Sequence, residues 1–499
     1  MAGAIFIISA LTLLSRIVGF GREIILANYF GISEIRGAFT VAFKIPNLLR
    51  TLLTETAISA AFIPVFTELL SKGNDDEAFS VASTIINFFA ILLTIVIAIC
   101  CIFMPAVISI CAPGFRSNEE LFQHTVRLSF IIFPTIIFLA VSGVIIGMLN
   151  SFNHFTAPAA GPVLWNIVII SMIILFQNKI GIYSAAWGIL IGTAAQFSVL
   201  LLPFKRLKIR YKPIIKLKDE NVRRIFRLIL PVSITLGIVN LNVFVDTIFA
   251  SYLGPRSIAA IDSAFRIFHL PMAIFAIAIG TALFPMLSRF SVDDDEKFKK
   301  TLQSGIGQIF YLTIPCSIIF FIMSVPIVKL VFERGSFSES DTVFVADALT
   351  FFAVGLPFTS ANTLLNRGFY SLKKNWAPAY VGIFNIALNA FLDWIFMKRW
   401  GHAGICLSTS MVSMFNFIAL TTIMKKTTNI NISAIAVSLF KISVASLPVG
   451  LLSFYIFSLF IDSSRGILFG PILLLSLIIP SSLYILITTF LKIDESEIT

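Results

Sequence analysis

The sequence predicts an all-α polytopic membrane protein. Of its 499 residues, 58% are hydrophobic and 13% are charged, and the mean hydropathy is +0.95, far above the values of soluble globular chains. The ranges 78–115 and 128–178 contain no Asp, Glu, Lys or Arg, and each exceeds the about 20 apolar residues that a helix needs to cross the hydrocarbon. Their long Ile, Leu and Phe runs exclude the alternating pattern of a membrane β-barrel.

Turn and charge signals divide the chain into about 14 transmembrane helices, with 79–112 and 302–332 each predicted as one span. The N-terminus lacks a basic region before its apolar stretch, so we interpret it as the first span rather than a cleaved signal peptide. An even number of spans places both termini on one side, and a strongly basic loop after the sixth span predicts that this side is cytoplasmic. The basic residues of that loop are Lys205, Arg206, Lys208, Arg210, Lys212, Lys216 and Lys218.

An internal repeat organises the chain. Residues 23–31 (EIILANYFG) match 246–254 (DTIFASYLG) at an offset of 223, and Ala-Pro at 157–158 matches Ala-Pro at 377–378 at an offset of 220. Such an offset spans six helices, so the halves have the same orientation, and duplicated halves with a site between them are typical of transporters. We therefore predict a first lobe at 1–204, a basic loop at 205–223, a second lobe at 224–427, and two extra helices with a tail at 428–499.

Charged side chains interrupt the first two apolar segments. A charge near the bilayer centre costs roughly 2.5–3.5 kcal/mol on insertion scales, so such groups are retained around a water-filled cavity or an ionic ligand. Lys44, Asn47 and Glu55 also share one helical stripe. The alternative is that the basic side chains extend from helix ends to the headgroups. The excess of cations favours an anionic ligand, with the candidate residues Arg16, Arg22, Glu23, Lys44, Arg50 and Glu55.

The second half carries a similar set at Asn242, Asp246, Asp262, Arg266 and His269. Arg266 is the repeat partner of Lys44, which favours a position in the same kind of cavity. An Asp262–Arg266 pair four residues apart could instead neutralise itself within one helix.

Oxygen-bearing side chains gather near the end of the second lobe. Asn385, Asn389 and Asp393 follow one another at steps of four, and Thr409 lies in the next predicted helix. Amide, carboxylate and hydroxyl oxygens suit a hard monovalent cation. In the alternative interpretation, Asp393 pairs with Lys398 or Arg399 at a polar helix end.

Several function classes lack support in the sequence. There is no Walker, HExxH or GxSxG motif, and the four histidines are scattered, so we predict no catalytic residues and a protein that is not an enzyme. The net charge of +11 is not gathered in a soluble basic domain, which argues against nucleic acid as a partner. The five cysteines have no zinc or disulfide spacing and are interpreted as packing residues.

The segments SRIVGFGREIILANYFG (15–31), AFKIPNLLR (42–50) and AISAAFIPVF (57–66) closely resemble the MurJ (MviN) lipid II flippases of the multidrug/oligosaccharidyl-lipid/polysaccharide exporter superfamily. The likeness continues through FERGSF (332–337) and HAGICLS (402–408). It implies two lobes around a central cavity, with two extra helices forming a groove for the polyprenyl tail. The implied function is translocation of lipid II, the lipid-linked peptidoglycan precursor, from the inner to the outer leaflet of the bacterial cytoplasmic membrane by alternating access.

The resemblance also implies site residues. Glu23 stands where other members have Asp, and Gly37 stands where some members carry Asp. We expect a monomer whose partners are lipid II and membrane lipids, with no cofactor other than Na⁺. The cavity arginines of the family, which handle the diphosphate and sugar headgroup, match Arg16, Arg22, Arg50 and Arg266. A sodium site of some members matches Asp246, Asn389, Asp393, Thr409 and the carbonyl of Ile405.

Two other functions stay open at this point. One is export of another polyprenyl-linked oligosaccharide, or of drugs, within the same superfamily. The other is a membrane-embedded polyprenyl-diphosphate transferase, which would need acidic metal ligands or a general base at the catalytic depth.

Overall fold

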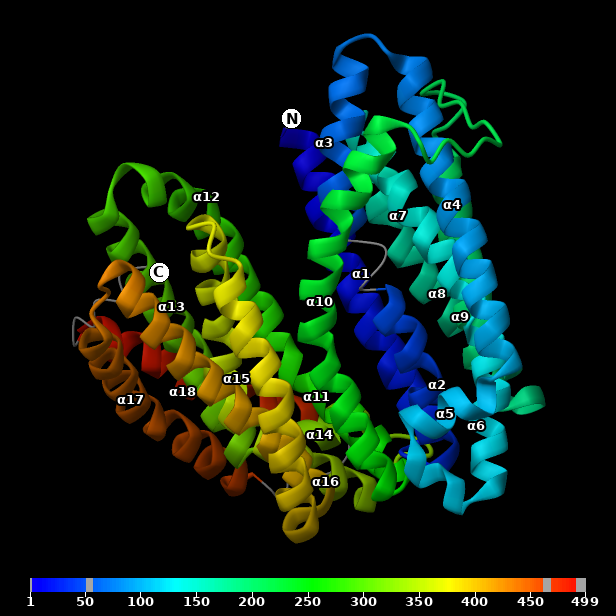
Figure 1. Cartoon of the computed structure of the whole chain (residues 1–499). Coiled ribbons are helices and arrows are strands. Elements are labelled where there is room, and N and C mark those ends of the chain that lie inside the picture. Colours follow the sequence, from blue (N-terminus) through cyan, green and yellow to red (C-terminus); the bar gives the residue numbers. More distant parts are fainter. Residues whose placement is uncertain (1, 51–56, 461–467, 491–499) are drawn as a thin grey trace. The chain divides into compact units, whose positions relative to one another are not determined.

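A computed structural model describes residues 2–50, 57–460 and 468–490, and within these ranges the regular structure is entirely helical. In this described part, ten helices are long and apolar enough to cross a membrane. The predicted fold class is therefore confirmed, whereas the number of 14 spans stays a prediction. The chain forms two compact units, Met1–Ala259 and Ala260–Thr499, which are described separately below (Figure 1).

The first unit is a bundle in which α1 packs on α8, α2 on α6, and α3 on α7 and α10. Its aromatic core includes the fully buried Phe62, Phe66 and Phe133. The elements are α1 (Ala2–Phe30), α2 (Glu34–Arg50), α3 (Ala57–Ser71), α4 (Asp75–Ile102), α5 (Met104–Cys111), the 3₁₀ turn η2 (Pro113–Ser117), α6 (Glu119–Ile132), α7 (Thr135–Ser151), α8 (Thr156–Ile180), α9 (Tyr183–Leu201) and α10 (Glu220–Tyr252).

The second unit is centred on α15, which packs against α12, α13 and α16, and α17 covers α13. Helix α11 (Pro255–Pro271) begins in the first unit and continues into the second. The other elements are the π-helical turn η3 (Met272–Ala276), α12 (Ile277–Asp293), α13 (Asp295–Ile322), α14 (Ser324–Phe332), α15 (Glu339–Ser371), α16 (Trp376–Thr428), α17 (Ile432–Leu459) and α18 (Phe469–Phe490).

The backbone repeats the pattern found in the sequence. Gly181, between α8 and α9, has φ +54° and ψ −138°, and Gly401, inside α16, has φ +56° and ψ −133°. Asn153 and Lys373, the next such pair, both have φ +56°. Both pairs are separated by the offset of 220 that relates the Ala-Pro matches. The internal repeat is therefore confirmed by conformations that L-residues rarely adopt.

Two predicted spans are each broken into two helices. The run 79–112 is divided at Phe103, with φ −103° and ψ 24°, and the run 302–332 at Met323, with φ −108° and ψ 22°. A proline follows each break, at Pro105 and Pro326. Because proline has no N–H and its ring collides with the carbonyl of residue i−4, it weakens a regular helix at these points.

Gly401 and its repeat partner Gly181 should each destabilise the fold when replaced by alanine. At their φ and ψ a Cβ is strained, at a cost of about 1–3 kcal/mol, although neither Cβ would meet a heavy atom within 4 Å. We expect Gly401→Ala and Gly181→Ala to lower the thermal midpoint of the purified protein. Gly21→Ala, in an open helical position, is the control and should not lower it. Equal midpoints for Gly401→Ala and Gly21→Ala would contradict the strain argument.

Candidate functional site

The guanidinium of Arg22 on α1 is held by an ion pair and by an aromatic ring. Its Nη2 is 2.5 Å from Oε1 of the buried Glu23, and its guanidinium carbon lies 4.6 Å from the centre of the Trp165 ring on α8. The exposed fraction of the Arg22 side chain is 11%. An acid and an aromatic face thus hold the guanidinium in place, which lowers the conformational entropy lost when it binds an anion.

Trp165 is itself fixed. Its Nε1 donates to Thr193 Oγ1 at 3.1 Å, and that hydroxyl donates to the Ile189 carbonyl at 2.7 Å. Trp165 was not predicted from the sequence. A polar Asn166 next to Trp165 in an otherwise apolar run is the sequence feature that could have indicated a functional position.

Close approach of α8 to α1 depends on Gly19. A Cβ there would lie 3.3 Å from Asn166 Nδ2, and Asn166 Nδ2 donates to the Pro162 carbonyl at 2.9 Å. Gly21, in contrast, has no neighbour within 4 Å of an added Cβ. Of the two glycines in the predicted cavity stretch, Gly19 therefore serves helix packing.

Lys44 is joined to α10. Its Nζ donates to Thr247 Oγ1 at 2.9 Å, and the buried Thr247 directly follows Asp246 in the chain. The first unit thus brings one predicted headgroup residue beside the helix turn that carries one predicted sodium ligand. Arg16, nearer the start of α1, is exposed. The side chain of Arg50 and the whole of Glu55 lie outside the described residues.

A buried arginine that was not predicted as a site residue lies at the start of α2. Arg36 is 1% exposed, and its Nη1 donates to the Gly31 carbonyl at 2.8 Å, beyond the end of α1. Its neighbour Gly37 allows close packing, because a Cβ there would lie 2.2 Å from the Pro255 carbonyl oxygen. A side chain at position 37, including the aspartate that the resemblance implies for some members, would collide with this backbone arrangement.

In the second unit, Arg266 makes the local ion pair that was considered as an alternative. Its Nη2 lies 3.4 Å from Asp262 Oδ2 one helical turn away. The side chains retain exposed fractions of 32% and 18%, so this cation is partly neutralised and partly accessible.

Four of the five predicted sodium ligands lie on α16, on both sides of the Gly401 kink, whereas Asp246 lies on α10 of the first unit. Asn389 and Asp393 are 1% and 0% exposed, and Asn389 Nδ2 donates to Asp393 Oδ2 at 3.3 Å. Ser408 Oγ donates to the Asn389 carbonyl at 3.2 Å, which adds a hydroxyl that was not predicted. Thr409 Oγ1 donates to the Ile405 carbonyl at 3.2 Å. The donor set is all oxygen, as a Na⁺ site requires.

The basic residues after Asp393 have other neighbours. Lys398 Nζ lies 3.8 Å from the centre of the Trp394 ring, and the Arg399 guanidinium carbon lies 5.1 Å from that of Trp400. Both cations and both rings are exposed. This arrangement is typical of membrane-interface anchors and favours the oxygen-cluster interpretation of the buried Asp393.

A polar stripe on α15 was missed. Asn362 and Asn366 are four residues apart, and Arg367 follows. Asn362 Nδ2 donates to the Ser413 carbonyl of α16 at 2.9 Å, and Arg367 packs so closely on α12 that a Cβ at Gly280 would lie 3.3 Å from its Nε. The four-residue spacing was a readable signal, of the same kind that identified Asn385 and Asn389.

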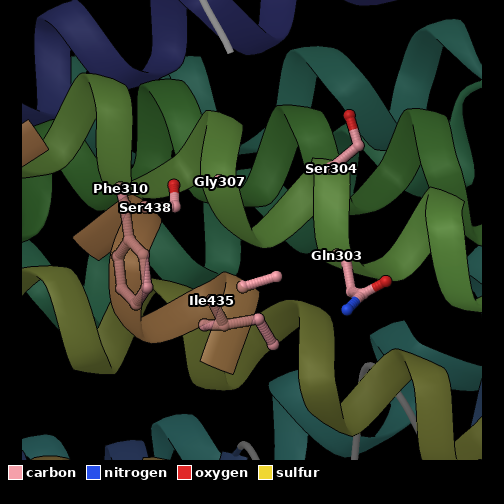
Figure 2. Close-up of a pocket in the computed structure, with 7 residues that line it drawn as sticks. Gln303, Ser304, Gly307, Phe310, Ile435 and Ser438 are labelled. Atoms are coloured by element: carbon pink, nitrogen blue, oxygen red, sulfur yellow. The ribbon is translucent and has the colours of Figure 1, made fainter. Parts of the chain in front are cut away.

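A cavity of about 190 Å³ lies between α13 and α17 (Figure 2). Gln303, Ser304 and Ser438 supply its polar groups, and Phe310 and Ile435 its apolar surface. Gln303 Nε2 donates to the Asn431 carbonyl at 3.0 Å. Since its lining includes no ionisable side chain, we do not assign an anionic headgroup to it.

Comparison with known proteins identifies the family. The model of the family described as lipid II flippase MurJ matches residues 26–473. The chain belongs to the MurJ family. The MurJ lipid II flippase of Burkholderia cenocepacia is 30% identical over 424 residues, covering 84% of this chain and 82% of the relative. The probable MurJ of Rickettsia prowazekii is 30% identical over 414 residues, covering 82% and 81%.

Solved structures agree with the MurJ assignment. A lipid II flippase MurJ in an inward closed conformation has a TM-score of 0.80 and 27% identity, over 96% of this chain and 98% of that one. An inward-facing multidrug resistance MATE transporter of the MOP superfamily has a TM-score of 0.66 at 15% identity, over 88% and 98%. The second likeness shows a shared fold only.

In this MurJ family member, Trp165 should act as a positioning residue for Arg22. We expect Trp165→Leu to reduce translocation of lipid II several-fold, because the guanidinium loses its aromatic face, an interaction worth about 0.5–2 kcal/mol. Trp165→Phe retains an aromatic face and should recover most of the rate. Thr193→Val, which removes only the hydrogen bond to the indole, is a matched variant and should have a smaller effect. Equal rates for the Leu and Phe variants at unchanged thermal midpoint would contradict this role.

Proposed function

We propose that the chain translocates lipid II from the inner to the outer leaflet of the bacterial cytoplasmic membrane by alternating access. The observation that carries the proposal is the MurJ family match over residues 26–473. The arrangement of Arg22 between Glu23 and Trp165 supports it, because a preorganised guanidinium in an apolar helix bundle suits a diphosphate.

The headgroup of lipid II is assigned to the cationic residues of the repeated helix pairs. Guanidinium groups bind phosphate oxygens in pairs and replace part of the water that the headgroup loses in the membrane. Acids beside them orient the cations and limit the net charge. The proposed set is Arg16, Arg22, Glu23, Lys44, Arg50, Glu55 and Arg266.

The polyprenyl tail is assigned to the last two helices, within 428–499. α17 exposes large apolar side chains, among them Leu447, Leu451 and Phe454, with exposed fractions of 53%, 63% and 52%. α18 does the same at Leu474 and Ile478. In a membrane such surfaces contact hydrocarbon chains, as a tail groove requires.

The proposal includes the lobes, the orientation in the membrane, the oligomeric state and the coupling ion. We infer lobes at 1–204 and 224–427 joined by the basic segment 205–223, both termini on the cytoplasmic side, and a monomer. Na⁺ is the proposed coupling ion, bound by Asp246, Asn389, Asp393, Thr409 and the Ile405 carbonyl. We also propose that the protein is a transporter without enzymatic activity.

Depletion of the protein in cells tests the function. Lipid II should accumulate on the cytoplasmic face, and the chain should restore its appearance outside in a strain that lacks its own flippase. Unchanged distribution of lipid II would favour export of another polyprenyl-linked oligosaccharide or of drugs. Chemical conversion of lipid II by the purified protein would favour a transferase, so the products of the incubation should be analysed as well.

A further inference from the structure

The basic segment after α9 is an ordered surface. It extends along the first turns of α4 (Figure 1, green, beside the label α4). The Lys212 N–H donates to Ser83 Oγ at 3.0 Å, and its carbonyl accepts from Asn87 Nδ2 at 3.3 Å. Tyr211 Oη donates to Asn87 Oδ1 at 2.6 Å. Polar side chains of α4 thus satisfy backbone groups of residues 212–216, which fixes this part of the segment against the helix.

Ion pairs fasten the same segment. Asp76 of α4 lies 3.1 Å from Lys212 Nζ and 3.5 Å from Arg210 Nη1. Beyond the segment, Arg224 of α10 pairs with Glu68 of α3 at 2.8 Å. Two of the seven cations of the segment are therefore paired with an acid at the start of α4.

The remaining cations point to solvent. All five are exposed, and they are Lys205, Arg206, Lys208, Lys216 and Lys218. Exposed apolar side chains lie among them, with exposed fractions of 76% for Leu202, 47% for Ile215 and 44% for Leu217. The only acid in 202–219 is Asp219, and its carboxylate caps α10 by accepting from two backbone N–H groups. We call these five cations and three apolar side chains the linker surface.

We propose that the linker surface binds the anionic headgroups of membrane phospholipids. The segment directly follows α9, a helix able to span the membrane, so it begins at the level of the headgroups. Clustered cations beside a membrane helix attract anionic lipids, and apolar side chains between them can enter the interface. The turn at 202–208 and the stretch 211–216 bonded to α4 present both kinds of side chain on an ordered backbone, which lowers the ordering cost at binding. This site goes beyond the proposed transport function.

Lipid-dependent stability of the purified full chain tests the linker surface. We expect phosphatidylglycerol to raise the thermal midpoint more than phosphatidylcholine, and high salt to remove the difference. The variant Lys205→Gln/Arg206→Gln/Lys208→Gln/Lys216→Gln/Lys218→Gln should lose more than half of the phosphatidylglycerol shift while keeping its midpoint in phosphatidylcholine. A control with the same charge change, Lys297→Gln/Lys299→Gln/Lys300→Gln/Lys425→Gln/Lys426→Gln, should keep the shift.

Three outcomes would overturn the proposal. The first is a thermal midpoint of the wild type that phosphatidylglycerol raises no more than phosphatidylcholine does. This measurement does not depend on the folding of any variant. The second is a linker variant that retains the full shift. The third is an equal shift with soluble glycerol phosphate at matched ionic strength, which would show binding of free phosphate rather than of a lipid surface. None of these measurements depends on transport, so they remain separate from the test of lipid II translocation.

Discussion

Arg22→Ala is expected to abolish translocation of lipid II while leaving membrane insertion normal. The change removes the guanidinium that Trp165 and Glu23 hold in place. A hydrogen bond to a charged group is worth about 1.5–3 kcal/mol, which corresponds to a loss of roughly 10- to 150-fold in binding. The measurements are complementation of a flippase-depleted strain and translocation of labelled lipid II in proteoliposomes, with protein level in the membrane as the reference.

Conservative and remote variants separate charge from geometry at Arg22. Arg22→Lys keeps the positive charge and can still approach Trp165 and Glu23, but it loses the planar fork that binds phosphate through two donors. We expect it to recover only part of the rate. Arg289→Ala removes an exposed arginine whose ion pair with Asp293 spans 3.7 Å in one helix, and it should leave translocation unchanged. Full complementation by Arg22→Ala would remove Arg22 from the headgroup site.

The fold was readable from the sequence because it follows from long-range composition. Charge-free runs and the offset of 220 between the Ala-Pro pairs reflect the bilayer and the duplication. The breaks at Phe103 and Met323 were missed because each lies inside an apolar run. Only the prolines after them mark the change, and prolines inside α8 and α15 do not break those helices.

The candidate site was predictable where charge was the signal, and not where packing decides. Arg36 is as charged as Arg22, but its Nη1 donates to the Gly31 carbonyl beyond the end of α1, and no pattern in the sequence shows that contact. Trp165 supports Arg22 from a helix about 140 residues away, a relation set only by tertiary packing. The sequence predicts a basic connection at 205–223, and α10 already begins at Glu220. The attachment of this segment to Ser83 and Asn87 depends on the same kind of long-range contact.

Asp393→Asn is expected to remove a stabilisation of the protein by Na⁺. Asp393 is fully buried beside Asn389, with the Ile405 carbonyl and Thr409 hydroxyl across the Gly401 kink of the same helix. A hard cation bound there would stabilise the chain by about 2.7 kcal/mol at a hundredfold excess over its Kd. It would also favour whichever conformer binds it more tightly, since only differential affinity shifts a conformational equilibrium. The measurement is the thermal midpoint in Na⁺ against K⁺ at equal ionic strength. Asp347→Asn, at an exposed acid of α15, should retain the Na⁺ effect. If the wild type responds equally to both ions, or Asp393→Asn responds like the wild type, the oxygen cluster is not a sodium site and its hydrogen bonds serve the α16 kink alone.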